Sequence, residues 1–181
     1  MMDAKRFLTV RVMVQLALLG AIAFVLTFVE TPLPFFPSFL KLDPSDIPAV
    51  FATATFGPIG GVVVQLIKAL LDMLKSSTAG VGQIANFVAG SAFAIPLGLI
   101  YRQRPTFSGF LLGEAVGVMC MVSMACMANY ILLPLYGLTV TLDLILWTLA
   151  PFNLLKATLI SVVCAALYVP LQPAMRLARR G

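Results

Sequence analysis

The sequence predicts an all-α membrane protein: a single bundle of six transmembrane helices with both termini in the cytoplasm. Three observations favour this class, since 61% of the 181 residues are apolar, only 10% are charged and the mean hydropathy is +1.03. Soluble domains carry about a quarter of their residues as charged side chains, so most of this surface must face lipid. Inside lipid, only α-helices and closed β-barrels satisfy the hydrogen bonds of their own backbone. Long apolar runs dominate here instead of the alternating segments of about ten residues that build a barrel.

The first helix is predicted over residues 8–29, after a basic N-terminal tail. A cleaved signal peptide is the alternative, because Ala21-Ile22-Ala23 resembles a cleavage site. The apolar run continues past that site to the length of about 20 residues that crosses a bilayer. We therefore favour a retained helix. Its small residues allow another helix to approach closely.

Residues 30–45 are predicted to form a loop rather than a helix. Four prolines in or at the end of this stretch remove backbone donors and restrict their neighbours. The stretch also carries three phenylalanines and three leucines, so it is not a hydrophilic linker. We expect an ordered, partly buried loop, and Ser45 or Asp46 can cap the helix that follows it.

Residues 46–74 are apolar almost throughout and could form one membrane span or two. The distribution of basic residues on the two sides of the membrane distinguishes these possibilities. A turn at Gly57-Pro58 divides them into helices 46–56 and 58–74 and gives six helices in all. Six spans place eight basic residues inside and two outside, whereas five spans would place four inside and six outside. The positive-inside bias prefers six. The eight inner residues are Lys5, Arg6, Arg11, Arg102, Arg104, Arg176, Arg179 and Arg180, and the two outer ones are Lys41 and Lys75.

Three further helices complete the predicted bundle, over residues 81–101, 108–133 and 151–169. The basic Arg102–Pro105 loop joins the first two. The last helix is expected to begin near Pro151, a favoured first-turn residue, after a loop that contains Trp147. Beyond Pro170 we expect a basic interfacial tail. No internal repeat is present, so residues 1–181 are predicted to form one domain.

Polar residues inside apolar spans are costly and therefore indicate function. In the six-helix topology Asn86, Asn129, Asn153 and Lys156 all lie at the outer ends of their helices, on the same side as the loop 30–45. Apolar walls with a few converging polar groups are typical of a ligand pocket. A structural role is the alternative for two of these residues. The Asn86 amide could simply form a hydrogen bond between helices, and the Lys156 side chain could simply extend to the membrane interface.

Other polar residues are interpreted as structural. Lys68 and Asp72 stand four residues apart on one helix, so they are expected to neutralise each other. Glu114 is expected to reach the cytoplasmic interface. Tyr130 and Tyr136 fit an aromatic belt as well as a pocket.

The chain lacks the motifs of several functional classes. It has no histidine, no P-loop and no paired-carboxylate or HExxH motif, so we expect neither ATP hydrolysis nor catalysis nor a metal site in this chain. The three cysteines all lie in apolar runs and predict no disulfide. The net charge of +5 is explained by cytoplasmic loops, so no nucleic-acid partner is expected.

Five segments nevertheless resemble a known family. They are FLKLDPSDIPA, FGPIGGVVVQLIKALL, GQIANFVAG, NYILLPLYG and PFNLLKA, in an order and spacing that cover nearly the whole chain. They are similar to the riboflavin-specific S components of energy-coupling factor (ECF) transporters. The resemblance implies the S-component fold of six helices with both ends inside.

The resemblance also implies a binding site for riboflavin as the transported substrate, without a cofactor. Asn129, Asn153 and Lys156 would hydrogen-bond the flavin, and the loop 30–45 would cover it. Pro44 departs from the family pattern, which has an aromatic residue there, so the packing of the loop is expected to differ. The full predicted ligand-binding set is Leu40, Lys41, Leu42, Asp43, Asn86, Asn129, Tyr136, Asn153 and Lys156.

The partners implied by the family are a transmembrane coupling subunit of the EcfT type and two cytoplasmic ATPases of the EcfA type. Ala17, Gly20 and Ala21 would dock on the coupling subunit, in a multi-pass protein of the cell membrane. Three alternatives are an S component for another vitamin, a stand-alone channel or carrier, and a membrane enzyme that acts on lipid or prenyl substrates. The enzyme would need clustered acidic residues, and the seven carboxylates are scattered.

Overall fold

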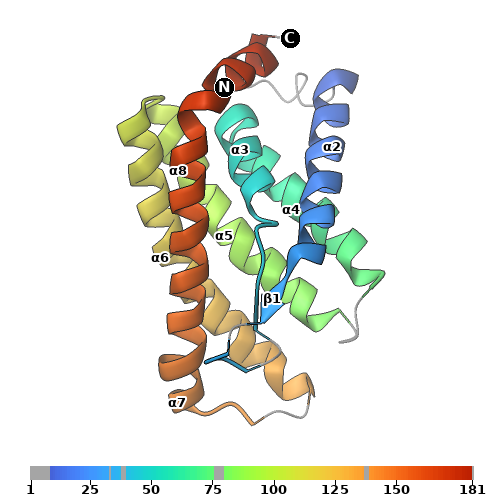
Figure 1. Cartoon of the computed structure of the whole chain (residues 1–181), viewed down its shortest axis with the longest axis vertical. Coiled ribbons are helices and arrows are strands. Elements are labelled where there is room, and N and C mark those ends of the chain that lie inside the picture. The colour runs from blue at the N-terminus through green and yellow to red at the C-terminus, as the bar shows by residue number, and fades with distance from the viewer. Residues whose placement is uncertain (1–8, 33, 38–39, 76–79, 137–138, 181) are drawn as a thin grey trace.

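The computed structural model describes residues 9–32, 34–37, 40–75, 80–136 and 139–180. The chain is mostly helical, which confirms the predicted class (Figure 1). In these ranges four segments are long and apolar enough to cross a membrane: Val10–Val29, Val81–Gln103, Phe107–Leu132 and Leu142–Ala178. Two shorter helices and a small β-hairpin complete the described architecture.

Helix α2 (Val10–Leu26) packs one face on helix α4 (Pro58–Met73) and continues into the 3-10 turn η1 (Thr27–Val29). Gly20 lies on the packed face, where a Cβ atom would come within 2.5 Å of the Ile67 Cγ2 atom. The prediction that Gly20 docks on a partner is therefore wrong, because this glycine makes room for α4 inside the bundle. Ala17 and Ala21, by contrast, are exposed.

Helix α3 (Ile47–Phe56) is only ten residues long and is buried from Pro48 to Phe56. It contacts helices α2, α4, α5 and α8, which surround it (Figure 1). Gly57 separates it from α4 with a backbone φ of 87°, a left-handed value that glycine adopts without a Cβ penalty. Pro58 then occupies the first turn of α4. Packing against four helices explains how so short a helix is stable in an apolar bundle.

Helices α5 (Val81–Gln103) and α6 (Phe107–Leu132) form a tightly packed pair. Glycines on α6 face α5 at close range: a Cβ atom on Gly113 would lie 2.8 Å from Leu97, and one on Gly117 would lie 3.0 Å from the Phe93 carbonyl oxygen. Thr106 caps α6, since its Oγ1 accepts a hydrogen bond from the Gly109 N–H at 3.1 Å.

The last helical region is longer than predicted at both ends. The short helix α7 (Leu142–Leu144) and a π-helical stretch, η3 (Ile145–Leu149), replace the expected loop and run into helix α8 (Ala150–Arg180). The wide π turn precedes Pro151, so the hydrogen-bond pattern changes where proline has no N–H to donate. At the other end α8 continues through Pro170 and Pro173 as helix, and Figure 1 shows its dark red end bending away from the main axis.

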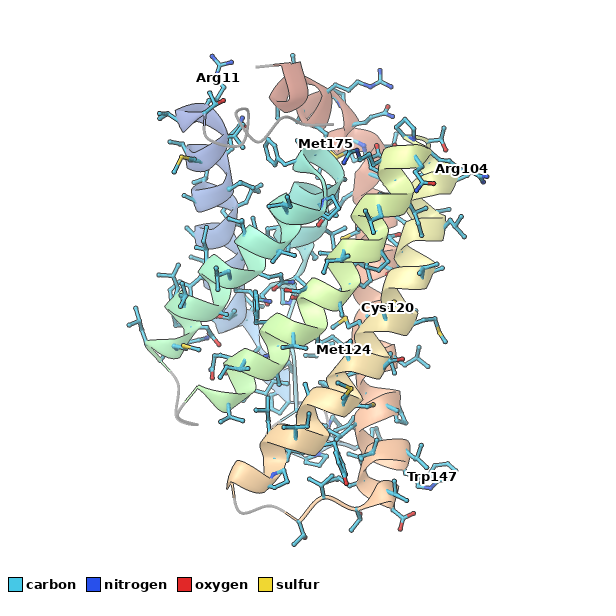
Figure 2. The ribbon with its side chains drawn as sticks, turned by 180° about the vertical axis from the view of Figure 1, so that it is seen from behind. Arg11, Arg104, Cys120, Met124, Trp147 and Met175 are labelled. Carbon is cyan, nitrogen blue, oxygen red and sulfur yellow. The ribbon has the colours of Figure 1, made fainter. Side chains whose placement is uncertain are left out.

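The two ends of the bundle differ in character. Figure 2 shows Arg11, Arg104 and Met175 at one end and Trp147 at the other. The start of α2 and the end of α8 share the basic end, whereas the hairpin and α7 lie opposite (Figure 1). Near the basic end α5 and α8 are joined by a hydrogen bond between the Tyr101 and Tyr168 hydroxyls at 3.0 Å. The predicted site residues of the loop belong to the other end.

Candidate ligand-binding site

The segment between η1 and α3 is held in place by a two-stranded hairpin. Strand β1 (Thr31–Pro32) pairs with strand β2 (Lys41–Leu42) in antiparallel register. The Lys41 Nζ atom lies 2.5 Å from the Glu30 Oε1 atom, and both side chains are exposed. An exposed ion pair contributes little stability. Lys41, a predicted ligand-binding residue, is therefore placed on the outer surface of the hairpin.

Apolar side chains fix the loop against the helices. Leu40 is buried in a cluster with Leu133, Leu149 and Phe152, which come from the ends of α6 and α8 and the turn between α7 and α8. The rings of Phe36 and Phe152 meet edge to face with centroids 5.3 Å apart, a favoured aromatic geometry. The cluster is an apolar wall at the end of the bundle that carries the hairpin.

Beside this wall, Lys156 of α8 is tied to the end of the loop. It is 3% exposed, and its Nζ atom lies 3.0 Å from the Asp43 Oδ2 atom and 3.5 Å from the Asp46 Oδ2 atom. Burial and the nearby Asp46 carboxylate oppose ionisation of Asp43. The Lys156 and Lys68 ammonium groups and the Ser45 hydroxyl together outweigh them, so the pKa of Asp43 is lowered from its ordinary value. Asp43 is therefore a carboxylate at neutral pH, and Lys156 is a buried ammonium rather than a side chain that extends to the interface.

The two predicted asparagines on these helices lie close to that wall. The Asn153 Nδ2 atom donates to the Leu149 carbonyl at 2.8 Å, and the Asn129 Nδ2 atom donates to the Ala125 carbonyl at 2.8 Å. Asn153 is buried one turn before Lys156 on α8. Asn129 shares a face of α6 with the buried wall residue Leu133. Each amide bonds within its own helix through one group, and its carbonyl oxygen has no partner among the described residues.

The other predicted residues are placed differently. Asn86 lies on the same face of α5 as buried Ala89 and Phe93, yet it is exposed, so this face of α5 is uncovered at that level. Leu42 and Asp43 are half-buried at the end of the hairpin. Tyr136 ends the 3-10 turn η2 (Leu133–Tyr136), and its side chain lies outside the described part of the chain.

Three predictions about charged residues are wrong. Lys68 does not pair with Asp72: its Nζ atom lies 2.5 Å from the Asp46 Oδ1 atom, while Asp72 faces Lys75 at 3.1 Å. Asp46 does not cap α3, because its carboxylate turns toward α4. Glu114 does not reach the interface either, since it is 2% exposed and its Oε1 atom has no partner among the described residues.

Part of this site was not predicted from the sequence. Ser45, Asp46, Gln65 and Lys68 join Asp43 and Lys156 in one buried polar group that links the loop to α4 and α8. The sequence does contain an indication of it, because Gln65 and Lys68 are polar residues three apart within an apolar span. Their partners come from another segment, which helix periodicity does not show.

Comparisons with known proteins point to one family. Residues 11–168 match the family described as "ECF transporter, substrate-specific component". Among curated relatives, the riboflavin transporter RibU of Staphylococcus aureus (strain TCH60) is 38% identical over 165 residues, which cover 86% of this chain and 87% of the relative. The riboflavin transporter FmnP of Bacillus subtilis (strain 168) is 31% identical over 177 residues, covering 91% and 93%.

The fold matches as well. A solved structure described as "Structure and mechanism of the S component of a bacterial ECF transporter" superposes with a TM-score of 0.81 at 38% identity. The match covers 90% of this chain and 96% of that one.

Proposed function

Because the chain belongs to the family of ECF transporter substrate-specific components, we propose that it binds riboflavin at the cell surface and delivers it inward. The family is one of transporter subunits, not of enzymes. The observation that carries the choice of riboflavin is the pairing of Lys156, one turn after Asn153, with Asp43 of the loop at one end of the bundle, in a chain whose curated relatives are named as riboflavin transporters.

The chemistry of the site suits the flavin ring. The pyrimidine edge of riboflavin offers an N–H donor between two carbonyl acceptors. A carboxamide can accept a hydrogen bond from the N–H and donate one to a carbonyl. Asn153 and Asn129 supply two such amides, and the Lys156 ammonium supplies a donor for a ring carbonyl. The apolar wall with Leu40, Phe36 and Phe152 supplies a surface for the flat ring.

We further propose that a bundle of six helices crosses the cell membrane and that both termini are cytoplasmic. The positions of the arginines support this orientation, since Arg11 and Arg104 lie at the end of the bundle where α2 begins and α8 ends. Basic residues accumulate on the cytoplasmic side of membrane proteins. The loop and the residues Asn153 and Lys156 then face outward, where the vitamin arrives.

The proposed partners are a transmembrane coupling subunit and two cytoplasmic ATPases, because this chain carries no P-loop. Ala17 and Ala21 lie on an exposed face of α2 and remain the predicted docking residues. Leu18 and Ile22 connect that face to an apolar groove of about 470 Å³ between α2, α3 and α8. Continuous apolar surface of this kind is suited to the helices of a membrane partner.

The test is a fluorescence titration of the purified protein with riboflavin, after any bound flavin has been removed. We expect quenching of flavin fluorescence on binding, and Asn153→Ala should weaken the affinity at least tenfold. Asn153 bonds only to a carbonyl of its own helix, so its loss should leave the thermal midpoint nearly unchanged. Thr158→Ala, on an exposed position of the same helix, is the matched control and should bind like the wild type.

Lys156 needs a balanced variant. Lys156→Ala alone would leave the Asp43 carboxylate buried without its cation, which is strongly destabilising. Lys156→Met combined with Asp43→Asn removes one charge of each sign, and it should fold and bind riboflavin at least tenfold more weakly. A wild-type protein that neither carries nor quenches riboflavin would overturn the proposed substrate, and normal affinity in both variants would show that the site is elsewhere.

A further inference from the structure

Asp46 connects two buried lysines that belong to different helices. Its Oδ1 atom accepts hydrogen bonds from Lys68 of α4 at 2.5 Å and from Gln65 of α4 at 2.7 Å. Its Oδ2 atom lies 3.5 Å from Lys156 of α8. The exposed fractions of Asp46, Lys68 and Lys156 are 5%, 4% and 3%. The carboxylate at the junction of the loop and α3 therefore holds α4 and α8 through the same two oxygens.

The neighbouring helix α5 leaves room for this arrangement. A Cβ atom on Gly90 would lie 2.2 Å from the Gln65 Nε2 atom, the same atom that donates to Asp46. Lys68 adds a second contact to the loop, since its Nζ atom lies 3.2 Å from the Ser45 Oγ atom. Four segments of the chain are thus fitted around one carboxylate.

The charges in this group balance, but burying them is expensive. Asp43 and Asp46 offset Lys68 and Lys156, so the formal sum is zero. Even so, removing paired charges from water costs several kcal/mol per ion, and apolar side chains of similar size often give an equal or higher stability. This largely buried group of four ions is therefore weak evidence for stability. Its geometry, by contrast, fixes the position of the Lys156 ammonium between two carboxylates.

We infer that Asp46, Lys68 and Gln65 are positioning residues for riboflavin: they do not touch the vitamin but hold Lys156, and through its pair with Asp43 the covering loop, in the binding geometry. This inference rests on the proposed function. Without Lys68, Asp46 has only Lys156 as a cation, and it draws that ammonium away from Asp43. The end of the loop then loses its fixed attachment to α8, so bound riboflavin should escape more quickly.

The experiment compares Lys68→Met with the balanced variant Lys156→Met/Asp43→Asn in a riboflavin titration with rapid dilution to measure release. Lys68→Met should weaken the affinity at least tenfold, mainly through faster dissociation. In the Lys156→Met/Asp43→Asn background, Lys68→Met is combined with Asp46→Asn, so that no buried carboxylate is left without a cation. This pair of changes should alter the affinity less than twofold, because residues that act through Lys156 have no further effect once Lys156 is gone. The absorption maximum of riboflavin bound to Lys68→Met should also move toward that of Lys156→Met/Asp43→Asn, which a loss of stability alone would not cause.

A second variant tests the same role if Lys68→Met does not fold. Gln65→Met removes a donor to Asp46 without changing any charge, and it also removes the Gln65 Oε1 atom, which is buried without a partner among the described residues. We expect at least threefold faster release of riboflavin and an unchanged thermal midpoint. Lys75→Met is the matched control, because Lys75 forms its ion pair with Asp72 on the same helix and should leave the affinity unchanged.

The outcomes separate the two proposals. A wild-type protein that does not bind riboflavin overturns the proposed function itself. If the wild type binds but Gln65→Met and every folded Lys68→Met variant bind and release riboflavin normally, the positioning role is overturned. An equal loss from Lys68→Met with and without Lys156 would also overturn it, since Lys68 would then act independently.

Discussion

At the scale of single residues, Glu114 stands apart from the other buried charges. It is 2% exposed on α6, one carboxyl oxygen has no partner, and no basic residue in the described ranges forms an ion pair with it. An unpaired buried polar atom costs about 1–3 kcal/mol. Glu114→Met keeps the length of the side chain and removes that cost. We therefore expect an unchanged or higher thermal midpoint, measured in detergent by intrinsic fluorescence.

Lys68→Met provides the opposite case, since it leaves Asp46 buried with one fewer cation and should lower the thermal midpoint. If Glu114→Met unfolds at a lower temperature than the wild type, then the carboxyl group contributes a stabilising contact that the geometry does not explain.

The residues of the site show what sequence reasoning can and cannot find. Lys156 and Asn153 were identifiable because polar groups are rare in apolar spans and stand one turn apart. The pairing of Lys68 was not, because the nearest acid along the helix is Asp72, whereas the acid that it meets in space, Asp46, is 22 residues away. Helical periodicity indicates which residues lie on the same side of a helix, but it does not indicate which residues of other segments pack against that side.

At the scale of elements, the packing of α5 on its neighbours depends on small residues. A Cβ atom on Gly98 would lie 2.7 Å from the backbone nitrogen of Pro58, at the start of α4. Backbone does not move aside as a flexible side chain does, so Gly98→Ala should destabilise the protein by about 1–3 kcal/mol. The readout is the free energy of unfolding in a denaturant titration.

Gly82→Ala on the same helix is the matched control. Gly82 is exposed, so an alanine there should be neutral or raise stability by up to about 1 kcal/mol through helix propensity. Equal effects of the two substitutions would contradict the close approach of α4 and α5.

Element boundaries were predictable where apolar runs end at charged or glycine-rich segments, as at Gly57-Pro58, and the predictions failed at the prolines of the last helix. The structure begins α6 at Phe107 and ends it at Leu132, close to the expected 108–133. Pro151 and Pro170 were expected to bound the last helix, but the helix passes through both. Neighbouring helices and a π-helical turn accommodate the missing donors in the folded protein, and no local pattern in the sequence reports that support.

At the scale of the whole molecule, the proposed orientation gives a direct labelling experiment. Asp143 lies on α7, at the end of the bundle that carries the hairpin, and Arg104 lies at the basic end (Figure 2). In intact cells, a membrane-impermeant maleimide should label Asp143→Cys, and it should label Arg104→Cys only after permeabilisation. The wild type with its three cysteines supplies the background, and the reverse labelling pattern would invert the topology.

The ten-residue length of α3 has a consequence for how the protein is made. At about 1.5 Å per residue it reaches half of a hydrocarbon core about 30 Å thick, so the insertion machinery cannot release it into lipid as a span of its own. Pro58 and the glycine turn bind it to α4 as a helical pair. α3 can therefore reach its native position only after α4 has been synthesised and after α5 and α8 have emerged to pack against it. The centre of the bundle is then the last part of the nascent chain to become native.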